Sequence, residues 1–344
     1  MSDLDLITLD SFAPSIPDRS IGLYTLYAPH AKAVCQITNY GARIVAMHVL
    51  DRDGQFVKVI KGFPKLEAYQ NEPQAFVGAV LGRCANKIAA GIFVLDGKTY
   101  ALDTNDTQTT LHGGSKGLHA QIWNVLKVSP RMLVLQFLLK EEMDGFPGNL
   151  DVEVVYEWED DGHFCITYHA NTDKATLVNL SNHAAFNLSG EMADHELLVS
   201  ASGFIEIDRR GIPSGKMLAV ENTAFDFRKP LKIASCHEQV HQQLDIRNGL
   251  DHVFVLENSR PALLLHSPVS GITLAVESDR PGMYIHFSRT SNSFQMEAED
   301  SMKDSIILSP QGFPDAIHHP YFPSIVLRPN EMFYTTTTYH FSIT

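Results

Sequence analysis

The sequence predicts an all-β protein, a large antiparallel β-sandwich that forms a single domain. Short runs rich in Val, Ile, Phe, Tyr and Thr recur along the 344 residues. Many of these runs are separated by dipeptides that suit tight turns, such as Asp53-Gly54, Asp96-Gly97 and Asp161-Gly162. Amphipathic patterns with the helical period of about 3.6 residues are scarce. We therefore expect a mostly antiparallel β structure, a large sandwich or barrel.

The predicted strands are spread over the whole chain. They are Ala33–Ile37, Arg43–Val49, Gly91–Val94, Arg131–Leu139, Leu150–Glu157, Gly162–Ala170, Ala262–His266 and Thr336–Ile343. Short helices are predicted near Pro64–Tyr69 and Cys236–Leu244. No linker rich in Gly, Ser or Pro divides the chain, so we expect one domain over residues 1–344, with residues 1–20 as a loosely attached N-terminal segment.

Composition narrows the classes of partner. The chain has 27 Lys and Arg against 40 Asp and Glu, a formal net charge of −13, which argues against a nucleic acid. No apolar run approaches the roughly 18 residues that span a bilayer, and the first residues are acidic where a secretory signal is basic. The four cysteines are far apart, which predicts reduced, buried thiols. We expect a cytoplasmic monomer or homodimer.

One predicted strand, Leu177–Leu188, carries an unusual polar face. Side chains alternate along a strand, so Asn179, Ser181, His183 and Asn187 share one side. That side has small polar groups around a single imidazole but neither Lys nor Glu, the residues that usually cover a solvent surface. The pattern favours the floor of a wet cleft and an ordinary polar outer face about equally.

Other segments offer weaker signals. His112 precedes two glycines that permit a tight turn. Asp251 opens an apolar run, where a turn-capping role is the simple alternative. His318 and His319 are adjacent, and neighbouring side chains of an extended chain point apart, so we expect no metal site there. Because the chain lacks the glycine-rich nucleotide loops and the G-x-S-x-G elbow, nucleotide-dependent and serine-hydrolase chemistry are not expected.

Taken together, the motifs resemble the aldose 1-epimerase (galactose mutarotase) family from about Tyr24 to the C-terminus. The supporting segments are NYGARIVAMHVLDRDG (39–54), VGAVLGRCANKIAAGIF (77–93), LHGGSKGLHAQIW (111–123), GFPGNLDVEVVYEW (145–158), VNLSNHAAFNLSG (178–190), IPSG (212–215), TAFDFRKP (223–230), GLDHVF (249–254) and FPDAIHHPYFPSIVLRPNE (313–331). The resemblance implies a large mutarotase-type β-sandwich that binds a small sugar. It also implies interconversion of α and β anomers by acid–base ring opening, without a cofactor.

The resemblance also assigns roles to individual residues. His183 matches the histidine of the family's NLTNH-like segment, which is its general acid. His112 matches the LHGG histidine, which is expected to bind substrate and support the ring-oxygen side. Asp251 is expected to bind sugar hydroxyls, and Asn86 matches the asparagine of the family's A-N-R segment.

Several positions depart from the family pattern. Lys87 stands at the A-N-R arginine, and Tyr284 at the glutamine of the P-G-x-Q segment, both expected to contact substrate. Ala184 and Ala185 replace Thr-Tyr after the catalytic histidine. Ser309 aligns with the glutamate of L-E-x-Q, the family's base. A serine hydroxyl is far too weakly basic near neutral pH to do that work.

The missing carboxylate leaves three interpretations open. Asp251, His286, Asp304 or Asp315 supplies the base, or water held by Ser309 does, or the protein binds a sugar without converting it. We predict an aldose 1-epimerase-type enzyme with an altered site. The alternatives are a non-catalytic carbohydrate-binding or regulatory protein on the same fold, and a lyase or hydrolase that uses Asp251 and Asp315 as facing carboxylates.

Overall fold

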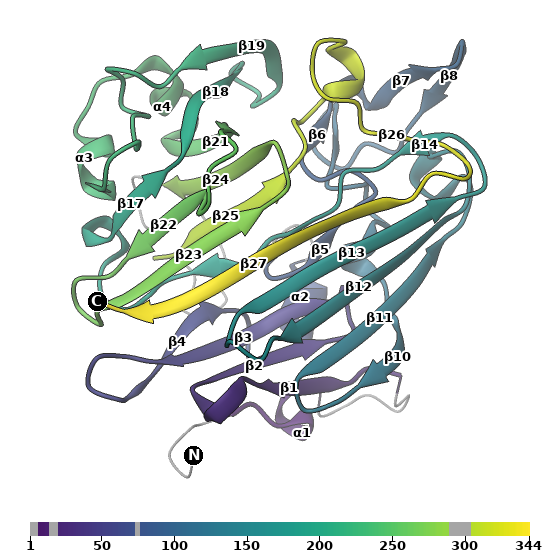
Figure 1. The fold of residues 1–344 in the computed structure, drawn as a ribbon. Coiled ribbons are helices and arrows are strands. Elements are labelled where there is room, and N and C mark those ends of the chain that lie inside the picture. Colours follow the sequence, from purple (N-terminus) through teal and green to yellow (C-terminus); the bar gives the residue numbers. More distant parts are fainter. Residues whose placement is uncertain (1–5, 14–19, 73–75, 289–303) are drawn as a thin grey trace.

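Two large antiparallel sheets pack face to face in the computed structural model, which describes residues 6–13, 20–72, 76–288 and 304–344 (Figure 1). This arrangement confirms the predicted all-β class. The C-terminal strand β27 (Phe333–Ile343) pairs with β13 (Phe164–Thr172) on one side and with β23 (Ile272–Ser278) on the other. One sheet therefore combines segments that are far apart in the sequence.

The first sheet has ten strands. In spatial order they are β1 (Leu23–Tyr27), β2 (Ala33–Thr38), β3 (Arg43–Leu50), β4 (Phe56–Lys61), β16 (Ala185–Phe186), β25 (Ile306–Gln311), β24 (Gly282–Ser288), β21 (Gly249–Leu256), β18 (Ala201–Ile207) and β19 (Pro213–Ala219). The second sheet has nine. They are β10 (Asn124–Val128), β11 (Met132–Leu139), β12 (Leu150–Trp158), β13, β27, β23, β22 (Leu263–His266), β17 (Glu196–Val199) and β20 (Leu231–Lys232).

Short elements connect and cover the two sheets. Two-residue and four-residue pairs are β5 (Val80–Leu81) with β15 (Ser181–Asn182), β6 (Lys87–Ile88) with β9 (Thr110–Leu111), β7 (Ile92–Leu95) with β8 (Lys98–Ala101), and β14 (Thr176–Leu177) with β26 (Val326–Leu327). The helices are α1 (Leu9–Phe12), α2 (Leu66–Asn71), α3 (Ile233–His237) and α4 (Gln242–Arg247). Among the described residues no helix has the length and apolar character needed to cross a membrane.

The main core lies between the two sheets, where alternate side chains of each strand point inward. Along β12 the side chains of Leu150, Val152, Val154 and Tyr156 are fully buried, while those between them are partly exposed. They pack in one cluster with residues of the ten-stranded sheet such as Ile285. Each fully buried aliphatic side chain stabilises the fold by roughly 1.5–3 kcal/mol, so the period-two pattern determines which face is inside.

The turn and cysteine predictions agree with the structure. Gly54, Gly97 and Gly162 all have positive φ, the backbone region that favours glycine. All four cysteines are buried and form no disulfide. Within residues 1–20, positions 1–5 and 14–19 lie outside the described residues, and the side chain of Phe12 is buried, with its ring centroid 6.3 Å from that of Tyr69.

Two secondary-structure predictions were wrong in detail. The helix predicted over Cys236–Leu244 is two short helices, because the chain turns between them and His241 Nδ1 accepts the backbone N–H of Gln243 to begin α4. The continuous strand predicted over Leu177–Leu188 is divided into β14, β15 and β16. Each part pairs with a different strand, since the segment passes from one pairing partner to the next.

Candidate active site

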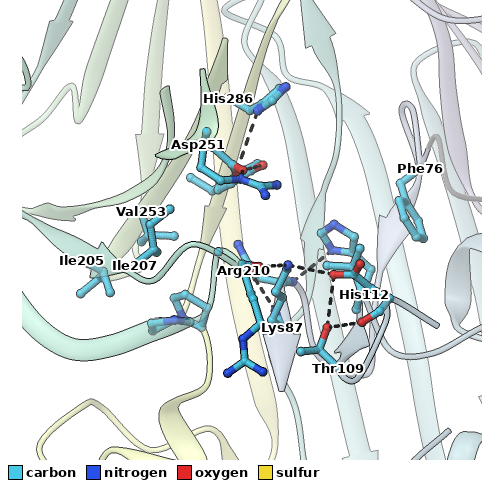
Figure 2. A pocket seen from close by; sticks show the side chains of 18 of the residues that line it. Phe76, Lys87, Thr109, His112, Ile205, Ile207, Arg210, Asp251, Val253 and His286 are labelled. Carbon is cyan, nitrogen blue, oxygen red and sulfur yellow. Dashed lines mark hydrogen bonds and ion pairs between the residues drawn. The ribbon is translucent and has the colours of Figure 1, made fainter. Parts of the chain in front are cut away.

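A pocket of about 400 Å³ lies on the outer face of the ten-stranded sheet, opposite the main core. Strand alternation produces this division. On β24, Met283 and Ile285 belong to the core, while Tyr284 and His286 line the pocket. Asp251 of β21 lines it beside them, and Figure 2 shows Asp251 and His286 together on one side, with His112 and Phe76 on the other.

His183 lines the pocket from the link between β15 and β16. Its backbone N–H donates to Ala79 O (3.0 Å) and its carbonyl accepts from Gly78 N–H (2.8 Å), which fixes its position. Burial, followed by the nearby His112 and His286, keeps the His183 pKa well below the ordinary value, so the imidazole is neutral. Its buried Nδ1 has no hydrogen-bond partner among the described residues.

His112 is held by an unusual backbone. Its φ is +52°, and Gly113 and Gly114 both have φ of +92°. A Cβ on Gly113 would lie 2.0 Å from Gly82 O, so only glycine fits there. The backbone N–H of Asn86 donates to His112 Nδ1 (3.0 Å), which places the ring proton on Nε2. Burial lowers the His112 pKa to about 3, so it is a neutral hydrogen-bond donor.

Asn86 and Lys87 form the adjoining part of the same wall. Asn86 has φ of +64°, and its Oδ1 accepts the backbone N–H of Lys87 (2.9 Å). Lys87 Nζ is 2.8 Å from Asp106 Oδ2 and donates to Arg210 O (2.7 Å), contacts that can be followed in Figure 2. The ammonium group is therefore fixed at the pocket by two other loops.

Asp251 is at the centre of a charged network on the opposite side. Tyr284 OH donates to Asp251 Oδ1 (2.7 Å), and Arg247 Nε donates to Oδ2 (2.5 Å). His286 Nδ1 lies 3.9 Å from Oδ1. Burial alone would raise the Asp251 pKa, but His286, Arg247 and Tyr284 outweigh it and lower that pKa, so the carboxylate is ionised near neutral pH.

Ser309 differs from the other predicted site residues because its side chain does not line the pocket. It is fully buried, donates to Asn182 O (2.7 Å) and shares a hydrogen bond with Ser181 Oγ (2.7 Å). It pairs across the strands with Tyr284, whose larger side chain does line the pocket. The hydroxyl of Ser309 is thus occupied by protein groups.

The structure also separates the other candidate bases. Asp304 accepts the backbone N–H of Met192 (2.9 Å), and Asp315 accepts that of Ala89 (2.9 Å); neither carboxylate lines the pocket. Asp251 and His286 both line it. Asp251 and Asp315 therefore do not face each other across this pocket as a hydrolase or lyase pair.

The polar face predicted for Leu177–Leu188 is not the floor of the cleft as a whole. Asn179 and Asn187 are buried and hydrogen-bond to the protein, for example Asn179 Oδ1 with Gly312 N–H (2.7 Å) and Asn187 Nδ2 with Asp304 O (2.6 Å). Of the face Asn179, Ser181, His183, Ala185 and Asn187, His183 is the residue that lines the pocket. Strand alternation alone does not show this, because the segment is not one strand.

Sequence reasoning missed several pocket residues. Arg247 forms an ion pair with Asp251, and Asp106 forms one with Lys87. The ring centroid of Phe76 lies 4.6 Å from that of His112. Arg247 comes four residues before Asp251, a spacing that gives a weak signal for an ion pair. Asp106 and Phe76 lie in loops without a recognisable motif.

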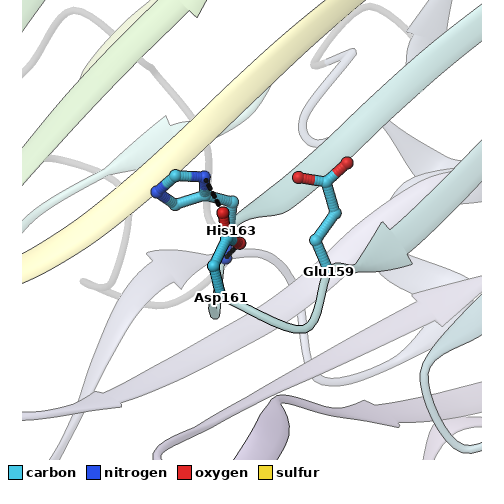
Figure 3. Close-up of side chains that lie close together, drawn as sticks. All are labelled: Glu159, Asp161 and His163. Atoms are coloured by element: carbon cyan, nitrogen blue, oxygen red, sulfur yellow. Dashed lines mark hydrogen bonds and ion pairs between the residues drawn. The ribbon is translucent and has the colours of Figure 1, made fainter.

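A separate group of possible metal ligands lies in the turn between β12 and β13 (Figure 3). One ligand atom each of Glu159, Asp161 and His163 lies within 4.8 Å of the others. His163 Nδ1 is 3.1 Å from Asp161 Oδ2, and both carboxylates are exposed. Exposed acidic groups of this kind commonly occur without an ion, and none of the three lines the pocket.

Comparisons with known proteins agree on one family. The profile of the family described as aldose 1-epimerase matches residues 23–340. The chain belongs to the aldose 1-epimerase family. A galactose mutarotase from Bos taurus is 36% identical over 321 residues, which cover 89% of this chain and 90% of the relative. An aldose 1-epimerase from Escherichia coli K12 is 30% identical, with coverage of 91% and 93%.

Solved structures give the same result for the fold. A C. elegans structure described as a GalM/aldose epimerase homologue has a TM-score of 0.85 and 27% identity, covering 94% of this chain and 99% of that one. A galactose 1-epimerase from Lactobacillus acidophilus NCFM has a TM-score of 0.81 and 28% identity, covering 93% of each chain. As a member of this family, the protein is an isomerase of the mutarotase class.

Proposed function

We propose that the protein interconverts the α and β anomers of an aldose in the pocket of Figure 2. The observation that carries the proposal is the convergence of His112, His183 and Asp251 on one cavity from three distant segments. Galactose is the first sugar to test, because several relatives are named galactose mutarotases.

The residues of the pocket suit the two halves of the reaction. Ring opening needs a base for the proton of the C1 hydroxyl and an acid for the ring oxygen. His183 in its protonated form is the acid in this proposal. Nε2–H of His112 is a second donor beside it, since the centroids of the two rings are 5.1 Å apart. After the aldehyde turns about C1–C2, the ring closes on its other face with the proton transfers reversed.

The remaining pocket groups bind the hydroxyls of the sugar. Asp251 is an acceptor, Asn86 and Lys87 are donors, and the ring of Tyr284 offers an apolar surface to a sugar face. Hydrogen-bonding side chains beside apolar ones suit a polyhydroxylated substrate. Ser309 takes no part, because protein groups already occupy its hydroxyl.

The experiment is to follow anomer exchange by NMR or polarimetry on freshly dissolved α-galactose, α-glucose and other aldoses. We expect equilibration faster than in buffer. His183→Asn should reduce the enzymatic rate on the order of 100- to 10,000-fold, the usual loss for a general acid. His169→Asn is the matched control, because His169 lies on β13 and contacts Tyr334.

Two outcomes would contradict the proposal. Binding of a sugar with no acceleration for any aldose would favour the non-catalytic carbohydrate-binding alternative. Full activity of His183→Asn would reject His183 as the acid. We further infer a cytoplasmic monomer or homodimer, which cell fractionation and light scattering test directly.

A further inference from the structure

The resemblance places Ser309 at the position of the family's base, and the Ser309 side chain does not line the pocket. Among the described residues, the carboxylates that line the pocket are Asp106 and Asp251. Asp106 is ion-paired with Lys87, and Asp251 accepts hydrogen bonds from both Arg247 and Tyr284. Each is therefore already held by a cation, which weakens it as a proton acceptor.

His286 is the remaining basic group on the strand side of the pocket. It lies two residues after Tyr284 on β24, so both side chains leave the same face of the sheet. The two rings are nearly parallel, 8° apart, with centroids separated by 6.4 Å. The Tyr284 ring also lies 6.0 Å from that of His183, so the pocket has an imidazole near each side of the tyrosine.

We propose that His286 is the base of this site, with Asp251 stabilising its protonated form. The proposal rests on the proposed function and deepens it. It requires the side chains of two strands to act together, His286 from β24 and Asp251 from β21, which pair directly at these residues. Asp251 is a positioning residue in this step as well as a substrate contact.

The two imidazoles, His183 and His286, supply and accept every proton that moves in this step. The reactive form has His183 as the protonated imidazolium and His286 neutral, and it is in equilibrium with the form in which His286 carries that proton. The C1 hydroxyl gives its proton to His286, the C1–O5 bond breaks with its electron pair on O5, and O5 takes the proton of His183. Ring closure on the other face runs the same transfers backwards, so no other reactant is required.

Imidazole is better matched to this task than the carboxylate beside it. A general base is most effective when its pKa is near the working pH, and the pKa of Asp251 is held below the ordinary carboxyl value. Burial lowers the pKa of His286, while Asp251 opposes this shift and Arg247 adds to it. His286 is therefore neutral near pH 7 and able to accept a proton.

A pH dependence follows from the groups that face His286, namely Asp251, Arg247, Tyr284 and His183. Burial is the first cause that lowers the pKa of both imidazoles from 6.5. Both imidazoles are thus neutral at pH 7. As the pH falls, the form in which one of the two is protonated becomes more populated. We expect enzymatic kcat/KM, after subtraction of the buffer rate, to reach its maximum below pH 6.5.

The decisive variants are His286→Gln and His286→Ala, with His169→Gln as the matched control outside the pocket. We expect His286→Gln to lower kcat on the order of 100- to 10,000-fold while sugar binding is retained. Added imidazole should restore part of the activity of His286→Ala, and a series of substituted imidazoles should rescue in proportion to their basicity. A merely structural role for His286 would not give that dependence.

Each result separates this proposal from the proposed function. Wild-type protein that accelerates no aldose rejects the proposed function. An active wild type with an equally active His286→Gln variant rejects His286 as the base and leaves the proposed function intact. Loss of activity without rescue by any imidazole, in a variant with wild-type circular dichroism and sugar affinity, also rejects it. An optimum above pH 6.5 in the wild type would reject the shared-proton pair.

Discussion

The two sides of the pocket are built in different ways. The loop side carries Asn86 and His112 on backbone with positive φ, next to Gly113, which tolerates no Cβ. The strand side carries Tyr284 and His286 on regular positions of β24. The sequence resemblance matches family motifs at Asn86 and His112 on the loop side and departs from them at Tyr284 and Ser309 on the strand side.

The difference shows where a site can change at low cost. On the loop side, the side-chain positions depend on a backbone conformation that few sequences adopt, so substitution disturbs the fold itself. On the strand side, the ladder hydrogen bonds do not depend on side-chain identity. Ser309 and Tyr284 are opposite each other across β25 and β24, a small residue beside a large one. That pair can change without breaking the sheet.

The largest expected effect tests the loop side. Gly113→Ala would place a Cβ 2.0 Å from Gly82 O at φ of +92°, so we expect the free energy of unfolding to fall by about 3–5 kcal/mol. Gly97→Ala is the matched control. Gly97 also has positive φ (+76°), but a Cβ added there would have no atom within 4 Å. The free energy of unfolding should therefore fall by only about 1 kcal/mol. Urea denaturation measures both; equal losses would contradict this account.

A smaller effect is expected when the loop contact itself is removed. His112→Ala leaves the Asn86 backbone N–H without its acceptor, which should cost about 1–3 kcal/mol of stability. The variant should also raise KM for the sugar. His112→Asn keeps an acceptor oxygen and should recover part of the stability but not the KM. If both variants are as stable as wild type, the hydrogen bond does not hold this loop.

The smallest effect is expected on the strand side. Tyr284→Phe removes one hydrogen bond to Asp251, which keeps its contact with Arg247. The free energy of unfolding should therefore fall by about 1 kcal/mol. The hydrogen bond from Tyr284 lowers the Asp251 pKa, and its removal should raise that pKa toward the ordinary value. NMR titration of the Asp251 carboxyl carbon checks the direction. An unchanged or lower pKa would show that Tyr284 does not act on this carboxylate.

Local sequence patterns predicted much of the fold. The strand expected over Leu150–Glu157 is β12 (Leu150–Trp158), and the one expected over Thr336–Ile343 is the end of β27 (Phe333–Ile343). Alternating burial and glycine turns are local properties, which explains this agreement. Leu177–Leu188 was harder to predict, because it is divided into three short strands that pair with four others, β26, β5, β25 and β4.

By itself, the sequence determined the fold class and the turns, and its motifs predicted that Asn86, His112, His183 and Asp251 share one site. All four line the same pocket. Only the tertiary structure decided which candidate bases line the pocket, and it selected Asp251 and His286 over Asp304 and Asp315. The physical reason is that strand pairing brings Asp251 and His286 side by side. The carboxylates of Asp304 and Asp315 instead accept backbone hydrogen bonds from other parts of the chain. No local pattern carries that information.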